Sequence, residues 1–203
     1  MPNSHSGSIE VQSPRFRDRR QLLREHLANV DADALLVIDL ANVRYLTGFT
    51  GSAACFLISQ HRETLISDAR YQQQIEEECV STGTNGPNEN LEIVIRGVAA
   101  TLTDAVVETI QSAGWNSVAF EAHRMVMSTF DELKIRLPAV ELVSTQGNVE
   151  RFRAIKDDFE IAAIRRSIDV NQRAFQNTVA NLSARQTERE FAFALENEMR
   201  ALG

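Results

Sequence analysis

The segment at residues 42–56 constrains the fold of this chain more than any other, because it separates two short apolar runs, 34–38 and 53–58. Each run has the length of a buried strand. Between them lie aromatic residues and two glycines, Gly48 and Gly51, which suit a backbone that turns with positive φ or passes close to another group. The pattern predicts a strand, a shaped loop and a second strand, with the aromatic rings packed onto the core as a lid.

The rest of the chain alternates between helix and strand patterns. Pro14 suits the first position of a helix that runs to about residue 28, and the five arginines from Arg15 to Arg24 are interpreted as its solvated face. Strands are expected at 34–38, 53–58, 63–66, 91–95, 117–120 and 140–144. Three further helices are expected: one that ends near Cys79, one at 101–112 and one at 125–136. The second and third strands should form a hairpin. The predicted fold class is α/β, a mixed sheet with helices on both faces.

The pattern becomes helical after residue 149. Asp157 with Glu160, and Thr187 with Glu190, have the spacing of capping boxes, and each pair should open an amphipathic helix. Little sequence follows that could bury the apolar faces of these helices. The expected division is a disordered tail at 1–13, an α/β domain at 14–148, and a linker with two helices at 149–203.

Composition excludes several classes of function. The 203 residues carry a net charge of −7, with a pI near 5.2, which argues against binding nucleic acid. No apolar run approaches the roughly 20 residues needed to cross a bilayer, and the amino terminus lacks the apolar core of a signal peptide. Cys55 and Cys79 resemble small buried hydrophobic residues. We therefore expect a cytoplasmic protein without a membrane partner.

Three expected strands end in a carboxylate: Asp39, Asp68 and Glu121. Open α/β sheets bind ligands at this edge, so converging acids could hold metal ions for a nuclease reaction. Strand-end acids also commonly cap helices or pair with arginine, and Arg70 lies beside Asp68. We rank the nuclease hypothesis last. The histidines are scattered and interpreted as surface residues, at His5, His26, His61 and His123.

Several ordered stretches carry a family resemblance. They are N-x-R-Y-L-T-G-F at 42–49, D-x-R-Y at 68–71, R-x-x-K-D-x-x-E-I at 153–161 and T-E-x-E-x-x-x-x-L-E at 187–196. Together they resemble the amino-terminal portion of the creatinase, prolidase and Xaa-Pro aminopeptidase family. The resemblance implies an amino-terminal domain of ribonuclease H-like α/β fold, followed by the first two helices of an incomplete pita-bread catalytic domain.

The resemblance also implies a chemistry. Family members cleave the peptide bond before proline with two divalent metals (Mn, Co or Zn) held by two Asp, one His and two Glu of the catalytic domain. No metal ligand and no catalytic residue of that set maps onto this sequence, so the chain alone is expected to be inactive and to hold no cofactor. The expected partners are a second copy, as a homodimer, and proline-containing peptides for the full-length enzyme.

In relatives, loops of this domain reach towards the active site of a neighbouring subunit. The resemblance therefore implies a loop that faces substrate or partner, comprising Arg44, Tyr45, Phe49, Thr50, Gly51 and Ser52. The function expected first is support of dimerisation and shaping of the active-site entrance in a proline-specific metallopeptidase. The alternative is a free-standing protein-interaction module derived from this family, which would bind a partner through its two last helices.

Overall fold

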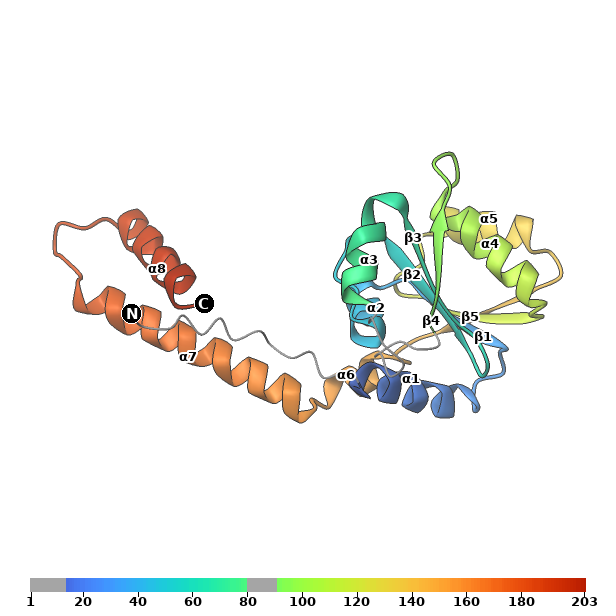
Figure 1. The fold of residues 1–203 in the computed structure, drawn as a ribbon, viewed down its shortest axis with the longest axis horizontal. Coiled ribbons are helices and arrows are strands. Elements are labelled where there is room, and N and C mark those ends of the chain that lie inside the picture. The colour runs from blue at the N-terminus through green and yellow to red at the C-terminus, as the bar shows by residue number, and fades with distance from the viewer. Residues whose placement is uncertain (1–13, 80–90) are drawn as a thin grey trace. The chain divides into compact units, whose positions relative to one another are not determined.

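The structure is a computed structural model that describes residues 14–79 and 91–203 (Figure 1). The chain divides into two compact units, a first unit at Met1–Arg153 and a second unit at Ala154–Gly203. The tail expected at 1–13 lies outside the described residues, as does the segment 80–90 between the helix expected to end near Cys79 and the strand expected at 91–95.

The described part of the first unit contains a six-stranded sheet in the order β4-β3-β2-β1-β5-β6. Its strands are β1 (Ala34–Val37), β2 (Ala54–Ser59), β3 (Glu63–Asp68), β4 (Leu91–Arg96), β5 (Ser117–Glu121) and β6 (Glu141–Thr145). Strand β2 is antiparallel to both of its neighbours, and every other pair is parallel. The predicted hairpin and the mixed sheet are confirmed. The carboxyl ends of β1, β5 and β6 consequently lie side by side at one edge of the sheet.

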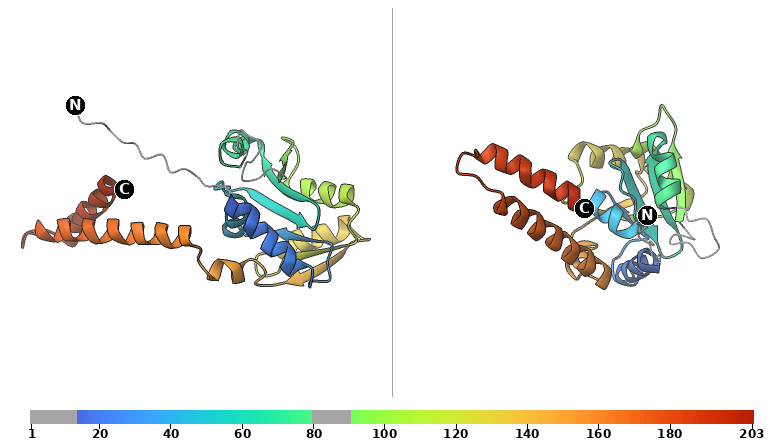
Figure 2. Two further views of the ribbon diagram at one scale, coloured as in Figure 1. Left: turned by 60° about the horizontal axis from the view of Figure 1, so that its bottom comes forward. Right: turned by 60° about the vertical axis from the view of Figure 1, so that its left-hand side comes forward.

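Helices cover both faces of this sheet, as predicted (Figure 1, Figure 2). One face carries α1 (Pro14–Leu27), α2 (Leu40–Thr47), the 3₁₀ turn η1 (Ala69–Tyr71), α3 (Gln72–Glu78) and α6 (Glu150–Ala154), and the other carries α4 (Leu102–Ala113) and α5 (Met127–Arg136). Alternation along β1 divides its side chains between the two cores, with Leu35 and Val37 in one and Leu36 in the other. A strand covered on both faces is apolar throughout.

The arginines of α1 do not form a solvated face, so that prediction is wrong. Arg20 is 1% exposed, and its guanidinium donates to Glu63 Oε2 at 2.8 Å and to the carbonyl of Leu46 at 2.9 Å. Arg24 also pairs with Glu63, which is itself buried. A buried carboxylate and the carbonyls of a helix end both need donors, and α1 supplies them. The guanidinium groups therefore fasten α1 to β3 and to the end of α2.

We predict that Arg20→Met lowers the free energy of unfolding by about 3–5 kcal/mol, because it removes one of the two arginine partners of a buried carboxylate. Arg17→Met, on the exposed side of the same helix, should change it by less than about 0.5 kcal/mol. The single tryptophan, Trp115, belongs to the first unit, so urea unfolding followed by its fluorescence measures both values. Equal effects of the two variants would contradict the assignment.

The second unit consists of α7 (Asp158–Ala180) and α8 (Glu188–Leu202). Both predicted capping boxes are present, at Asp157 with Glu160 and at Thr187 with Glu190. The helices pack on each other, but Ala174 and Thr178 are the buried residues of α7, and α8 has none. Large apolar side chains are exposed at Phe159, Ile164, Ile168, Phe175, Val179, Leu182 and Phe193. The predicted apolar faces exist and are largely uncovered.

Limited proteolysis of the monomeric chain should cut between residues 154 and 186 before it cuts the first unit. So little side-chain burial leaves these helices to open at low free-energy cost. The fragments are identified by mass spectrometry at concentrations where light scattering gives a monomer. Full protection of this segment in the monomer would show that the helices are stable alone.

Candidate functional site

The signature at residues 42–49 begins as a helix, whereas the sequence predicted a loop. Asp39 is the N-cap of α2, and its Oδ1 accepts the N–H of Ala41 at 2.8 Å. Gly48 ends the helix in the left-handed conformation, with φ 85°, and donates its N–H to the carbonyl of Arg44. Arg44 and Tyr45 therefore lie on α2, and the loop starts only at Gly48.

Both glycines are required where they stand. A Cβ on Gly48 would lie 2.9 Å from ring atoms of Phe16, in addition to the strain of its positive φ. A Cβ on Gly51 would lie 2.8 Å from Cδ1 of Tyr71 and closer still to the ring of Phe49. The two roles expected of glycine, a left-handed turn and a close approach, are thus divided between the two positions.

Phe49 belongs to the core rather than to a contact surface. It is 1% exposed, and its ring meets that of Tyr71 edge to face, with centroids 5.6 Å apart. The lid interpretation is confirmed for this residue. Tyr45 is half-buried, with the Arg19 guanidinium 3.9 Å above its ring centroid. A ring as buried as that of Phe49 does not reach a ligand in this conformation, and the expected contact of Tyr45 with a ligand stays a prediction.

The exposed rim of the loop is polar and tied to α3. Thr50 donates its N–H to Glu78 Oε2 at 2.8 Å, and its hydroxyl accepts from Gln74 Nε2 at 2.8 Å. The hydroxyl of Ser52 lies 2.7 Å from that of Tyr71. These bonds hold the loop in one shape while Thr50 and Ser52 remain exposed.

Arg44 differs from the other residues of the signature. Its side chain is exposed, and within the described residues it makes no hydrogen bond or ion pair. A guanidinium that the fold does not use is available for a carboxylate or a carbonyl of another molecule.

Alanine at Gly48 should cost more stability than alanine at Gly114, and both should cost more than alanine at Gly97. Gly114 has φ 67° with open space around it, so Gly114→Ala measures the left-handed strain alone, about 1–2 kcal/mol. Gly48→Ala adds the clash with Phe16. Gly97 has neither constraint, and Gly97→Ala should be neutral or slightly stabilising. Urea unfolding ranks the three, and equal costs at 48 and 114 would mean that Phe16 moves aside freely.

A second group of polar residues lies where β1, β5 and β6 end. Glu121, at the end of β5, is 3% exposed and accepts the N–H groups of Ile38 and Asp39, both at 2.7 Å. It also accepts from the side-chain amide of Asn42. Burial raises the pKa of Glu121, and these hydrogen bonds oppose the rise. This carboxylate fixes the turn that leads from β1 into α2.

Asn42, the first residue of the signature, connects this turn to α6. It is fully buried, and its amide nitrogen donates to Glu150 Oε1 at 2.7 Å, while its oxygen accepts from Arg153 at 2.8 Å. Partial burial raises the pKa of Glu150, but the Asn42 hydrogen bond contributes to a net lowering. The asparagine thus joins the end of β5 to the segment after β6.

Asp39, His123 and Glu150 gather at this edge. Each offers one ligand atom, and the three atoms lie within 4.8 Å of one another. His123 Nε2 is 3.3 Å from Glu150 Oε1, and Arg124 Nε donates to Asp39 Oδ2 at 2.7 Å. Burial raises the pKa of Asp39, but the bonds from Ala41 and Arg124 outweigh it and leave the pKa lowered. The sequence pointed to this edge through Asp39 and Glu121 but missed His123 and Glu150.

Asp68 does not join the other two strand-end acids. Asp68 ends β3, and β2 lies between β3 and β1. Two strand spacings of about 4.8 Å each therefore separate the end of β3 from the end of β1, which Asp39 follows. Its carboxylate is held by Arg70 at 2.8 Å and by Arg96 at 3.5 Å, and the Arg70 hydrogen bond lowers the pKa of Asp68 to about 2. The expected pairing with Arg70 is confirmed. The nuclease hypothesis loses the convergence of three acids on which it depended.

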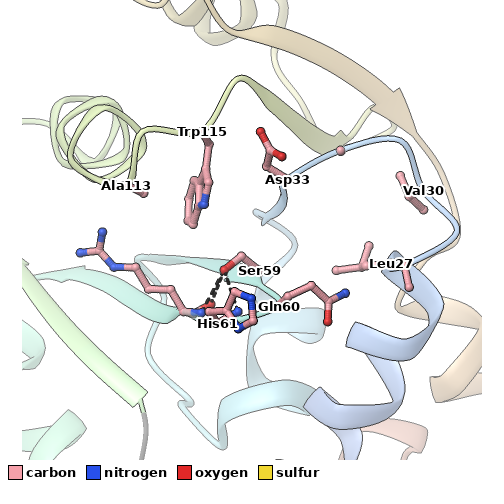
Figure 3. A pocket seen from close by; sticks show the side chains of 11 residues that line it. Leu27, Val30, Asp33, Ser59, Gln60, His61, Ala113 and Trp115 are labelled. Atoms are coloured by element: carbon pink, nitrogen blue, oxygen red, sulfur yellow. Dashed lines mark hydrogen bonds between the residues drawn. The ribbon is translucent and has the colours of Figure 1, made fainter.

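A hollow of about 550 Å³ opens at the opposite end of the sheet (Figure 3). Trp115 points into it from one side, and the turn that begins at Ser59 forms another wall. The polar atoms in its walls hold local turns: Ser59 Oγ accepts the N–H groups of His61 and Arg62, and Asp33 accepts two backbone N–H groups that precede and open β5. We assign this hollow no function.

Comparison with known proteins agrees with this fold and signature. The profile of the Creatinase/Prolidase N-terminal domain family matches residues 19–155, and the chain belongs to that family. A curated relative, described as an uncharacterized peptidase YqhT of Bacillus subtilis (strain 168), is 29% identical over 181 residues. That match covers 89% of this chain and 48% of the relative.

Solved structures show the same relationship. An Xaa-Pro dipeptidase from Bacillus anthracis superposes with a TM-score of 0.78 at 27% identity, over 93% of this chain and 50% of that one. An X-Pro aminopeptidase from Thermotoga maritima MSB8 gives 0.77 at 28% identity, over 92% and 49%. The N-terminal domain of the cytoplasmic peptidase PepQ from Mycobacterium tuberculosis H37Rv gives 0.56 at 30% identity, over 66% and 97%. The chain spans about half the length of the YqhT relative and of the Bacillus anthracis and Thermotoga maritima structures.

None of the helices in residues 14–79 and 91–203 combines the length and the apolar composition needed to cross a membrane.

Proposed function

We propose that this chain is the amino-terminal part of a proline-specific metallopeptidase, an Xaa-Pro aminopeptidase or Xaa-Pro dipeptidase. The observation that carries the proposal is the match to Xaa-Pro peptidases over both units, from the α/β domain through the two capped helices. A match limited to the first unit would fit any protein that uses this domain. A cytoplasmic location is part of the proposal and is supported by the name of the PepQ relative.

In this proposal the first unit supports dimerisation and shapes the entrance to the active site. Hydrolysis, and the two divalent metals (Mn, Co or Zn) that drive it, belong to the pita-bread catalytic domain, whose metal ligands do not map onto any of these 203 residues. Support for the entrance role comes from Arg44, whose side chain is exposed on the helix that leads into a loop bonded to Gln74 and Glu78. An arginine on a fixed helix can bind a peptide carboxylate or carbonyl with a defined geometry.

The alternative is a protein-interaction module that works without a catalytic half. The exposed apolar side chains of α7 and α8, such as Ile164, Ile168 and Phe175, favour it because a patch of this kind marks a contact surface. The same patch would serve to pack a catalytic domain in the first proposal. The two proposals differ in what covers it.

The coding sequence beyond the codon for Gly203 separates the two. A reading frame that continues with the two Asp, one His and two Glu of a cocatalytic metal site supports the peptidase, and a stop codon there supports the module. The protein from the whole continuing frame should hydrolyse an Xaa-Pro peptide with Mn²⁺ or Co²⁺, and the 203-residue chain should not. Turnover by the 203-residue chain would overturn the assignment of hydrolysis to another part.

In the active protein, Arg44→Ala should lower kcat/KM for an Xaa-Pro peptide by about tenfold, the value of one charge-assisted hydrogen bond of about 1.4 kcal/mol. Lys134→Ala, an exposed cation on α5, is the matched control and should leave the rate unchanged. Metal content is measured in parallel and should be equal in both variants. Unchanged kinetics for Arg44→Ala would remove this residue from the entrance.

A further inference from the structure

The carboxyl ends of three adjacent parallel strands bring Asp39, His123 and Glu150 together. Asp39 follows β1, His123 follows β5, and Glu150 opens α6 after β6. We propose that these three side chains bind one divalent first-row transition-metal ion, of the Zn²⁺ or Co²⁺ type. Their ligand atoms already lie within 4.8 Å of one another without an ion between them. The proposal goes beyond the proposed function and does not depend on it.

Glu150 supplies an independent reason for a cation here. Its Oε1 accepts from Asn42 and lies beside His123, but its Oε2 is buried and has no hydrogen-bond partner among the described residues. A buried carboxylate oxygen without a donor is costly, and native proteins rarely leave one. A metal ion that Glu150 binds through both of its oxygens would give Oε2 a partner, while Oε1 stays beside His123.

Asp39 can contribute without loss of its structural role. Its Oδ1 caps α2 through the N–H of Ala41, while its Oδ2 is held by Arg124. The Arg124 side chain is 57% exposed and can turn into solvent. The metal would take its place on Oδ2, and the N-cap would remain.

Bond lengths of about 2.0–2.2 Å place the ligands of a tetrahedral ion closer together than 4.8 Å, so the site must contract on binding. The exposed His123 side chain can make that movement. Glu150 stays in place because Asn42, itself held by Arg153, fixes its other oxygen. Second-layer hydrogen bonds of this kind orient metal ligands.

The ligand set and the local charge select the ion. One imidazole and two carboxylates suit borderline first-row metals better than Mg²⁺ or Ca²⁺, which prefer oxygen alone. Two guanidinium groups lie among the carboxylates of Asp39, Glu121 and Glu150: Arg124 donates to Asp39, and Arg153 donates to Asn42, whose amide donates to the two glutamates. When Arg124 moves away, three negative charges remain against one positive charge, which favours a dication.

The test is titration of the 203-residue chain, free of any affinity tag, with Zn²⁺ by calorimetry and with Co²⁺ by absorption spectroscopy. We expect one ion per chain, and a Co²⁺ spectrum that shows a nitrogen ligand. His123→Ala and Asp39→Asn should each weaken binding at least tenfold, and asparagine retains the N-cap. His61→Ala, an exposed histidine in the β2–β3 turn, is the matched control and should bind like the unaltered chain.

A charge-matched pair of variants separates a built site from diffuse binding to an acidic surface. Arg124→Ala removes the competitor for Asp39 and should tighten Zn²⁺ binding several-fold. Arg70→Ala also removes one positive charge, at an exposed arginine just after β3, and should change the Zn²⁺ affinity little. Equal effects of the two, or binding that survives His123→Ala, would overturn the proposal.

Zn²⁺ should also raise the unfolding temperature followed by Trp115 fluorescence, and His123→Ala should abolish that rise, because ligands that bind only the folded state stabilise it. The exposed position of His123 keeps this variant folded. None of these measurements uses peptide hydrolysis, so their outcome is separate from that of the peptidase assay.

Discussion

The structure of the signature depends on one buried carboxylate, that of Glu121. It accepts the N–H groups of Ile38 and Asp39 and the amide of Asn42, and so closes the turn from β1 into α2 from the neighbouring strand. These donors recover part of the cost of burying a charge, which is visible in the raised pKa of this group. Without this acceptor the N–H groups of Ile38 and Asp39, where the chain leaves β1, would be unsatisfied.

The family signature is mainly a set of structural devices around that turn. Asn42 bridges Glu121 and Glu150, Gly48 permits the left-handed end of α2, and Phe49 closes the core. At the other end of the helix, Arg19 and Arg20 donate to the carbonyls of Tyr45 and Leu46, which α2 cannot satisfy itself. Arg44 is the one residue of 42–49 with an exposed side chain, and it is therefore the signature residue that folding does not explain.

Sequence predicted the features that local pattern specifies. Apolar runs located the described strands, and the spacing of Asp157 with Glu160 and of Thr187 with Glu190 located two helix starts. The error at α2 was avoidable, because Asp39 and Gly48 have the spacing of an N-cap and a C-cap around an eight-residue helix. The loop was predicted because the segment contains aromatic residues and two glycines. The burial of the α1 arginines could not be predicted from local sequence, because Glu63, the partner of Arg20, lies 43 residues away.

The sequence predicted Asp39 as a candidate site residue but not His123 or Glu150, and the reason lies in the topology of the sheet. A carboxylate after a strand is visible in sequence, but which strands are neighbours is not, and the order β1-β5-β6 is what brings Asp39, His123 and Glu150 together. The same order excludes Asp68, because the antiparallel β2 is inserted between β1 and β3. Asp39 and Arg44 stand near the two ends of one short helix, which Asn42 fastens to Glu150. A cation held at Asp39 would therefore help to fix α2, the helix that presents Arg44. In this way an ion bound where β1, β5 and β6 end would affect the position of the exposed arginine of the signature.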